Sequence, residues 1–252
     1  ISEFAKATGA TVYSYSLLDD SPWRAAARAV YGKDKVPAYR LDEADYILAF
    51  NSNFLEAWPS PVYYGRLFGE FRQGPRRMQG EHGRFVYIGP RLSMTAAKSD
   101  QWLPCNPGTE EMIARAISAA IGGATAALSD AATASGVPLE QLQNVVTDFK
   151  AAGSRAVALG GDLLSTQPNG TAAMIAVEAL NAQVKSQCVG FGDAALPLAP
   201  KSSSGFRQMQ QLIAQMGAGN IGALLLLGHA NPVFTLPNAT GLTDALARVT
   251  FI

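Results

Sequence analysis

Short apolar runs alternate along this chain with segments whose apolar residues recur at helical spacing. An apolar run of roughly four to eight residues is typical of a strand buried on both faces, whereas a period near 3.6 predicts an amphipathic helix. Their alternation predicts an α/β fold with a mostly parallel sheet. The predicted strands are Thr11–Ser16, Tyr46–Phe50, Phe85–Ile88, Ala156–Leu159, Ala223–Leu227 and the start of a strand at Thr250–Ile252.

Helices are predicted between these strands. Thr109 is a plausible N-cap, with Glu110 placed to complement the helix dipole, and Pro138 suits a first helical position. The stretch between Gly122 and Gly136 is almost entirely Gly, Ala, Ser and Thr, which predicts a linker or an exposed crossover over residues 122–137. Further helices are predicted to end at Gly9 and to cover Thr171–Gln187 and Phe206–Met216, the last with a methionine-containing stripe expected in the core.

Composition restricts the class of function. The chain has 252 residues with 20 basic and 20 acidic side chains, so its net charge does not favour nucleic acid. Basic residues gather locally, and this group is either a solvated loop surface or a contact with an anionic ligand: Arg66, Arg72, Arg76 and Arg77. No apolar run reaches the roughly 18 residues that a membrane span needs. The absence of an initiator Met and the strand that starts near the last residue predict a piece of a longer protein.

Cysteine and histidine are scarce. Cys105 and Cys188 lack the spacing of metal ligands and are expected to be small core thiols, although a disulfide stays possible. With only His82 and His229 besides, a four-ligand zinc or iron–sulfur site within this segment is not expected. His229 is the best single candidate for an acid or base, with a structural, hydrogen-bonded histidine as the more ordinary alternative.

Polar, turn-forming loops follow the predicted strands directly. Asn51, Ser52 and Asn53 follow Phe50 and could donate to phosphate or sugar oxygens, or could simply form a turn. In an open parallel sheet, ligands bind beyond the carboxyl ends of the strands. These loops are therefore where a nucleotide-like ligand is expected.

The loop after the next strand offers a second polar set. Arg91, Ser93 and Thr95 stand at alternate positions and could point to a common side, as a phosphate or ribose set. The alternative is that Arg91 pairs with a neighbouring carboxylate such as Asp100.

The second half repeats the strand-then-glycine pattern. Gly160, Gly161 and Asp162 follow one strand, and Gly228 with Asn231 follows another. Neither loop is a Walker motif or the three-glycine dinucleotide fingerprint, and no serine-hydrolase elbow is present.

Taken together, the order of these loops resembles the molybdopterin oxidoreductase (dimethyl sulfoxide reductase-like) family. The segments that carry the resemblance are Ala44–Leu48 with Asn53–Glu56, Pro90–Arg91 through Thr95–Ala96, Asp100–Leu103, Pro107–Glu110, Gly160–Gly161 and Gly228–Pro232. The resemblance implies two Rossmann-like, doubly wound domains, residues 1–121 and residues 138–252, the second truncated at its C-terminus. Each domain would hold one arm of a molybdopterin guanine dinucleotide cofactor that carries molybdenum or tungsten. The implied nucleotide contacts are Asn51, Asn53, Glu56, Arg91, Thr95, Gly108, Glu110, Gly161, Asp162, Gly228 and Asn231.

Three departures from the family pattern weaken the expected cofactor site. Gly89 stands where the family usually has an acid before Pro-Arg, Glu110 replaces a shorter Asp, and the Asn53–Pro61 segment is bulkier than the usual loop. In these features the chain resembles cofactor-less catalytic-like subunits of menaquinone reductase and alternative complex III assemblies.

This likeness implies an oxidoreductase-type subunit in a quinone-linked electron-transfer complex at the periplasmic side of the bacterial inner membrane. Its expected partners are iron–sulfur and membrane subunits, and an iron–sulfur cluster is expected upstream of Ile1. Two alternatives stay open: an active pterin-dependent enzyme for a small oxyanion, a sulfur compound or formate, and a non-catalytic α/β module that binds a nucleotide or a protein.

Overall fold

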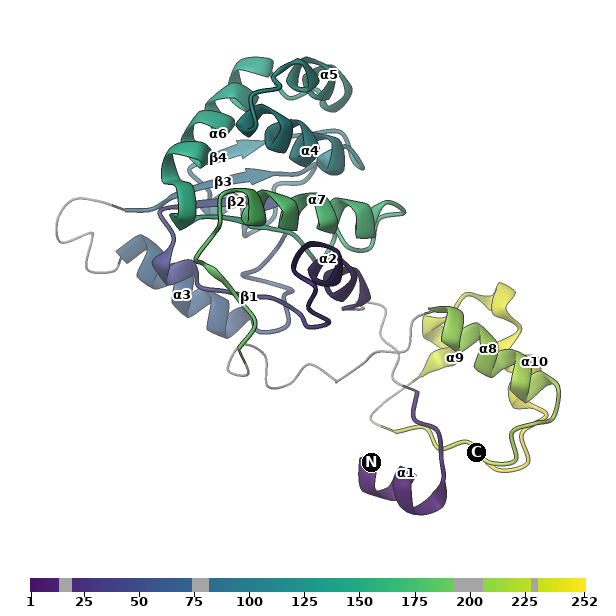
Figure 1. Ribbon diagram of the computed structural model, residues 1–252. Coiled ribbons are helices and arrows are strands. Elements are labelled where there is room, and N and C mark those ends of the chain that lie inside the picture. Colours follow the sequence, from purple (N-terminus) through teal and green to yellow (C-terminus); the bar gives the residue numbers. More distant parts are fainter. Residues whose placement is uncertain (14–19, 74–81, 193–205, 228–230) are drawn as a thin grey trace. The chain divides into compact units, whose positions relative to one another are not determined.

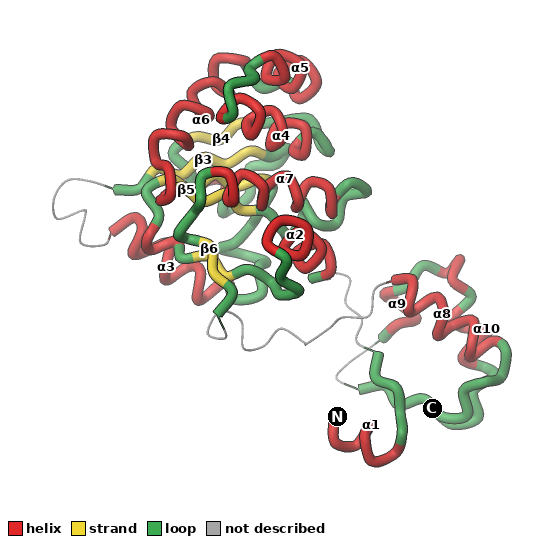
Figure 2. The backbone as a smooth tube through the Cα atoms, viewed as in Figure 1, coloured by secondary structure: helices red, strands yellow, loops and turns green. Residues whose placement is uncertain are grey.

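The computed structural model in Figure 1 describes residues 1–13, 20–73, 82–192, 206–227 and 231–252. The chain is a mixed α/β protein with a four-stranded parallel sheet, so the predicted fold class is confirmed. It forms two compact units: residues 22–199, which hold the sheet, and residues 1–21 together with 200–252. Figure 2 shows how the strands and helices divide between them.

The sheet has the strand order β4-β3-β2-β5, with every pair parallel. Its strands are β2 (Tyr46–Phe50), β3 (Arg84–Ile88), β4 (Gln101–Leu103) and β5 (Ala156–Leu159). Three of them confirm the strands predicted from apolar runs. The chain runs outward from β2 through β3 to β4 and returns on the other side of β2. The point where this order reverses, between the carboxyl ends of β2 and β5, is where open α/β sheets bind ligands.

Helices cover both faces of this sheet. In Figure 1, α4, α5 and α6 lie together on one side and α3 lies on the other. The unit contains α2 (Ser21–Tyr31), α3 (Pro61–Gln73), α4 (Glu110–Ile121), α5 (Ala126–Ser135), α6 (Leu139–Ala152) and α7 (Gly170–Gln183). Its short elements are β1 (Ala38–Tyr39), which pairs antiparallel with β6 (Val189–Gly190), and the 3₁₀ turns Leu41–Glu43, Ala96–Lys98 and Gly153–Arg155.

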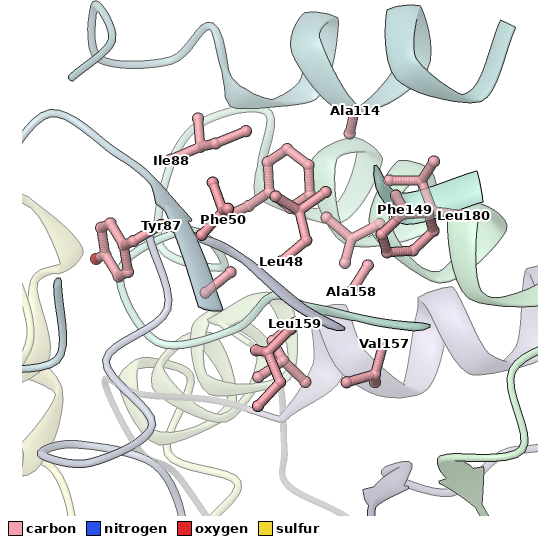
Figure 3. Packing of buried hydrophobic residues seen from close by; sticks show 14 of the residues in the cluster. Leu48, Phe50, Tyr87, Ile88, Ala114, Phe149, Val157, Ala158, Leu159 and Leu180 are labelled. Carbon is pink, nitrogen blue, oxygen red and sulfur yellow. The ribbon is translucent and has the colours of Figure 1, made fainter. Parts of the chain in front are cut away.

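The core lies on both faces of the central strands, as their unbroken apolar sequences predict. Leu48 and Phe50 of β2 lie with Phe149 of α6 on one face (Figure 3), and all three are fully buried. On the other face, Phe85 of β3 packs edge-on against Phe68 of α3, with 5.6 Å between the ring centres. Burial on both faces fixes the sheet and therefore the positions of the loops at its carboxyl edge.

Residues 122–137, predicted to be a linker or an exposed crossover, contain helix α5 in the connection between β4 and β5. Leu128 and Ala131 are buried there, and the helix contacts α4 and α6. The segment is helical and not an unstructured linker because alanine has the highest helix propensity and its small side chain lets helices pack closely. The two predicted halves also share one sheet, since β5 pairs with β2. The compact units therefore differ from the expected division at residues 122–137.

The second unit is mainly helical in its described part. It contains α1 (Ser2–Thr8), α8 (Phe206–Gly217), α9 (Pro232–Thr235), a 3₁₀ turn (Asn238–Thr240) and α10 (Leu242–Leu246). Met209, Ile213 and Met216 are buried in its core, as predicted for the methionine-containing stripe. Helix α1 ends at Gly9, whose φ of 69° is the left-handed angle typical of a helix end.

The sequence predicts three strands in this unit. Two of them do not form strands, and the third is only partly described. Ala223–Leu227 and Thr250–Ile252 meet only through an isolated parallel bridge between Ala223 and Phe251. Leu225 is 52% exposed, so the prediction of a buried strand there is wrong. An apolar run forms a buried strand only where neighbouring chain covers it, and the described residues supply one bridge. Residues 11–13 are irregular, and 14–16 lie outside the described residues.

Candidate functional site

Polar backbone and side-chain groups meet where the carboxyl ends of β2 and β5 lie side by side. Asn51 has a left-handed φ of 45°, which asparagine tolerates better than most residues, and its N–H donates to Ile88 O over 2.7 Å. The next residue, Ser52, donates from Oγ to Gly160 O over 3.0 Å. This bond joins the loop after β2 to the glycine turn after β5. These two loops therefore lie side by side in the structure.

The turn after β5 has an unusual backbone. Gly161 has φ 100° and Asp162 has φ 50°, so two successive residues adopt positive angles. Asp162 is only 7% exposed, and its main-chain oxygen accepts bonds from the N–H and the Oγ of Ser165. Burial raises the pKa of the Asp162 carboxyl, and hydrogen bonds from Asn53 and from the Leu163 backbone oppose that rise. The turn thus holds a buried carboxyl beside the switch point.

Glu110 connects the first turn of α4 to both loops. Its side chain is 1% exposed, and Oε1 accepts from Asn51 Nδ2 over 3.2 Å and from Gln167 Nε2 over 2.9 Å. Asn169 Nδ2 donates to Gly108 O over 3.2 Å. The Pro-Gly-Thr-Glu segment, the loop after β2 and the loop after β5 therefore form one hydrogen-bonded group.

Several buried polar atoms of this group have no hydrogen-bond partner among the described residues. Four of them are oxygens: Asn51 Oδ1, Glu110 Oε2, Asp162 Oδ2 and Gln167 Oε1. A buried oxygen without a donor costs about 1–3 kcal/mol, so most such atoms in folded proteins are paired. These oxygens could accept hydrogen bonds from a ligand that carries N–H or O–H groups.

The three polar side chains of the loop after β3 differ in burial. Ser93 and Thr95 are buried, whereas Arg91 is exposed. The hydroxyl and N–H of Thr95 both donate to Glu56 Oε2 over 3.0 Å, so these two predicted ligand residues bind each other. That Arg91 points to the same side as Ser93 and Thr95 stays a prediction.

Asp100 does not serve as the partner of Arg91. Its carboxylate pairs with Arg72 of α3 over 2.9 Å, and Arg72 also donates to the backbone oxygens of Gly83 and Lys98. Arg72 therefore ties loops together, which is a structural role for this member of the basic group. Arg76 and Arg77 lie outside the described residues.

Aromatic side chains cover the glycine that replaces the family's usual acid. A Cβ atom added to Gly89 would lie 2.8 Å from Cε1 of Tyr87, too close for any side chain unless the ring moved. The Tyr87 hydroxyl donates to Asn53 Oδ1 over 2.9 Å. Phe54 and Trp58, from the bulky loop, are 0% and 3% exposed and belong to the core. The polar side chain expected at position 89 thus has its space taken by a neighbouring ring.

A second glycine is covered by a residue that sequence reasoning missed. A Cβ atom at Gly161 would lie 2.0 Å from Cζ2 of Trp23, so the indole rests directly on the turn after β5. Trp23 comes from α2, and its ring meets Trp58 edge-on with 5.6 Å between the ring centres. Its only sequence signal is an aromatic residue in the first turn of a helix, which does not reveal what the ring contacts.

The second-half residues are only partly accounted for. Gly228 and His229 lie outside the described residues. Asn231 belongs to the other compact unit, where its backbone oxygen accepts from Phe234 and Thr235 at the start of α9. The nucleotide contact that the family resemblance implies for Asn231 stays a prediction.

Other chemistries have little support in the part of the chain that the structure describes. Cys105 and Cys188 are free and buried, as expected for core thiols, and burial raises their pKa values to about 12 and about 11. Within the described ranges, no group of three His, Cys, Asp or Glu side chains is placed to hold a metal ion. None of the helices described is both long and apolar enough to cross a membrane.

Comparisons with known proteins show what the chain is similar to. No family model matches the chain. The chain is 28% identical over 240 residues to the menaquinone reductase molybdopterin-binding-like subunit of Nitratidesulfovibrio vulgaris, covering 84% of this chain and 34% of that protein. A segment of 79 residues, 31% of this chain and 8% of the relative, is 29% identical to the molybdopterin-containing subunit of arsenate respiratory reductase from a Shewanella strain.

The fold also matches a solved structure. Acetylene hydratase from Pelobacter acetylenicus superposes with a TM-score of 0.54 at 17% identity, over 68% of this chain and 25% of that enzyme. The chain therefore spans about a third of the longer curated match and a quarter of this enzyme.

Proposed function

Because the chain resembles the molybdopterin oxidoreductase family in sequence and in fold, we propose that it is part of a subunit of a membrane-associated, quinone-linked electron-transfer complex in which the pterin site is degenerate. The relative that matches most of the chain is named as a subunit of menaquinone reductase and as molybdopterin-binding-like. We further propose that iron–sulfur and membrane subunits are its partners and that it works at the periplasmic side of the inner membrane.

The observation that carries the degenerate site is the Gly89–Tyr87 contact. An acid at this position could accept hydrogen bonds from a ligand's hydroxyls, but Gly89 has no side chain, and a Cβ there would lie 2.8 Å from the Tyr87 ring. Glu56 and Thr95 are bound to each other. Among the side chains expected to contact the nucleotide, Thr95 is bound to Oε2 of Glu56, and position 89 offers no acceptor, so the site lacks part of the set of groups that the family's cofactor needs.

The packing of the bulky Asn53–Pro61 loop supports the same proposal. Phe54 packs against Phe68 and Phe85 at 5.6 and 5.5 Å between ring centres, and Trp58 packs on Tyr64 at 4.6 Å. These rings anchor the loop to the core, which reduces its freedom to adjust around a ligand.

The proposal is tested on the full-length protein purified with its complex. Acid extraction followed by oxidation converts a bound pterin to a fluorescent product, which is then quantified against protein. The proposal expects a pterin content far below one per chain, together with stoichiometric iron–sulfur and membrane subunits in the preparation. A stoichiometric pterin would refute the degenerate site, and a monomeric, partner-free protein would refute the assignment to a complex.

A second candidate, an active enzyme that binds the guanine dinucleotide cofactor, has one observation in its favour. Glu110, Asn51 and Asp162 keep buried oxygens that have no partner among the described residues and that a ligand's N–H groups could satisfy. The pterin extraction separates the two candidates. Turnover of a small oxyanion, sulfur compound or formate by a pterin-loaded protein would establish the second.

A further inference from the structure

We propose that Trp23 is an internal occupant of the crevice between β2 and β5, and that removing its indole opens a site for a planar bicyclic ring that carries N–H donors. The proposal rests on the degenerate site described above and names the residue that closes it at the turn after β5. It concerns residues of the 22–199 unit alone.

The position of the indole supports this role. Open α/β sheets bind ligands at the switch point, and a glycine there lets a ligand approach the backbone closely. Gly161 is such a glycine, with φ 100°, and the point where its Cβ would lie is 2.0 Å from Cζ2 and 2.5 Å from Cε2 of Trp23. The surface that a glycine leaves for a flat ligand is therefore covered by a flat side chain of the same protein.

Polar atoms in this part of the molecule stay without hydrogen-bond partners although the indole covers the turn after β5. Trp23 is 6% exposed, yet its Nε1 has no acceptor among the described residues. Asp162, Glu110 and Asn51 each keep an unpaired, buried oxygen in the same hydrogen-bonded group. A ring whose N–H groups reached these oxygens would satisfy atoms that Trp23 leaves unpaired, which favours a donor-bearing ligand once the indole is gone.

Contacts at the other end of α2 help to hold Trp23 in this position. Tyr31, at the other end of α2, donates from its hydroxyl to Glu178 Oε2 over 3.0 Å and contacts the Phe191 ring at 5.2 Å. Trp23 itself is wedged edge-on against Trp58. The helix is thus anchored at both ends, so the indole is a fixed part of the crevice.

The test compares Trp23→Ala with wild type and with Phe149→Ala in the full-length protein. Phe149 of α6 is fully buried and its ring meets Tyr46, the first residue of β2, so its removal opens a cavity at the opposite end of that strand from Asn51. Guanosine serves as the probe because it is a planar bicycle with several N–H donors, and inosine serves as the matched probe that lacks the amino group. Binding is measured by isothermal calorimetry on samples whose folding is checked by circular dichroism.

We expect Trp23→Ala to bind guanosine at least tenfold more tightly than wild type or Phe149→Ala, and to prefer guanosine over inosine. Adding Asp162→Asn, which exchanges an acceptor for a donor, should remove this gain. Equal guanosine affinity in folded Trp23→Ala and wild type would overturn the proposal, as would equal affinity in Phe149→Ala.

A second variant covers the case in which Trp23→Ala does not fold. Trp23→Phe keeps one ring in the core but is shorter than the fused indole that covers Gly161, and a gain in guanosine binding of at least threefold is expected from it. No gain would again refute the role of Trp23. Failure of this proposal differs from failure of the degenerate site, because the latter appears as bound pterin in the wild-type protein whatever the variants bind.

Discussion

The hydroxyl of Tyr39 should contribute measurably to the stability of the 22–199 unit through Glu178. Glu178 of α7 is fully buried, and its carboxyl accepts from the hydroxyls of Tyr39 and Tyr31 and from Asn181 Nδ2. A hydrogen bond to a charged group contributes about 1.5–3 kcal/mol, and for a chain of this size each kcal/mol shifts Tm by about 2–4 °C. Tyr39→Phe should therefore lower Tm by roughly 3–12 °C.

The pH dependence of this loss follows from the direction of the shift. Burial raises the pKa of Glu178 above its ordinary value, and the hydrogen bonds from Tyr39, Asn181 and Tyr31 oppose that rise. Because its pKa is higher in the folded state, Glu178 binds its proton more tightly in the folded protein than in the unfolded chain. This stabilisation is fully present when the pH is below the ordinary glutamate pKa, and it is lost as the pH rises through the folded-state pKa. Because Tyr39→Phe removes a donor to the charged form, it should cost more at about pH 8 than at about pH 5.

The assay is thermal and urea unfolding of wild type, Tyr39→Phe, Glu178→Gln and the double variant. In the Glu178→Gln background the charge is absent. The free energy of unfolding lost through Tyr39→Phe should therefore be smaller and should no longer differ between about pH 5 and about pH 8. Additive single effects, within about 0.3–0.5 kcal/mol, would mean that the two residues are not coupled and would refute the reasoning. The result matters for the site because Tyr31 of α2 shares this carboxyl, and α2 carries Trp23.

Three further outcomes are expected. Gly161→Ala should destabilise the unit by more than about 1–3 kcal/mol in thermal unfolding, because φ is 100° and the new Cβ would meet Trp23; a loss within 0.5 kcal/mol would contradict the described turn. Asn181→Ala should lower the free energy of unfolding by roughly 2–5 kcal/mol, because the side chain of Asn181 accepts a hydrogen bond from the backbone N–H of Ala158 and donates one to its oxygen; unchanged urea unfolding would refute this. Arg91→Ala should leave Tm nearly unchanged because Arg91 is exposed, and it should weaken guanine nucleotide binding by about 1–3 kcal/mol in any form of the protein that binds one; unchanged affinity on calorimetry would refute a contact between Arg91 and the nucleotide.

The sheet could be predicted from sequence because its strands are buried on both faces. An unbroken run such as Tyr46–Phe50 leaves few alternatives, and the structure confirms it with the same bounds. Gln101–Leu103 has only three residues and too little pattern to be recognised. Ala223–Leu227 has the composition of a buried strand, but burial depends on what covers it, and composition carries no information on that.

The site could be predicted only as far as the sheet determines it. Asn51 and Gly161 come together because parallel strands place their carboxyl ends at one edge, and Glu110 joins them from the start of α4. The roles of Trp23 and Tyr87 could not be predicted in this way. Each depends on which glycine its ring covers, which is a tertiary contact that neither periodicity nor motif order encodes.

Metal content of the full-length protein tests the central claim most directly. The claim is that the loops at the carboxyl ends of β2 and β5 have the arrangement of a pterin-binding fold but no longer fit the cofactor. Elemental analysis of the purified complex, normalised to this chain, should give molybdenum and tungsten far below one atom per chain alongside abundant iron. One atom of molybdenum or tungsten per chain would contradict the account.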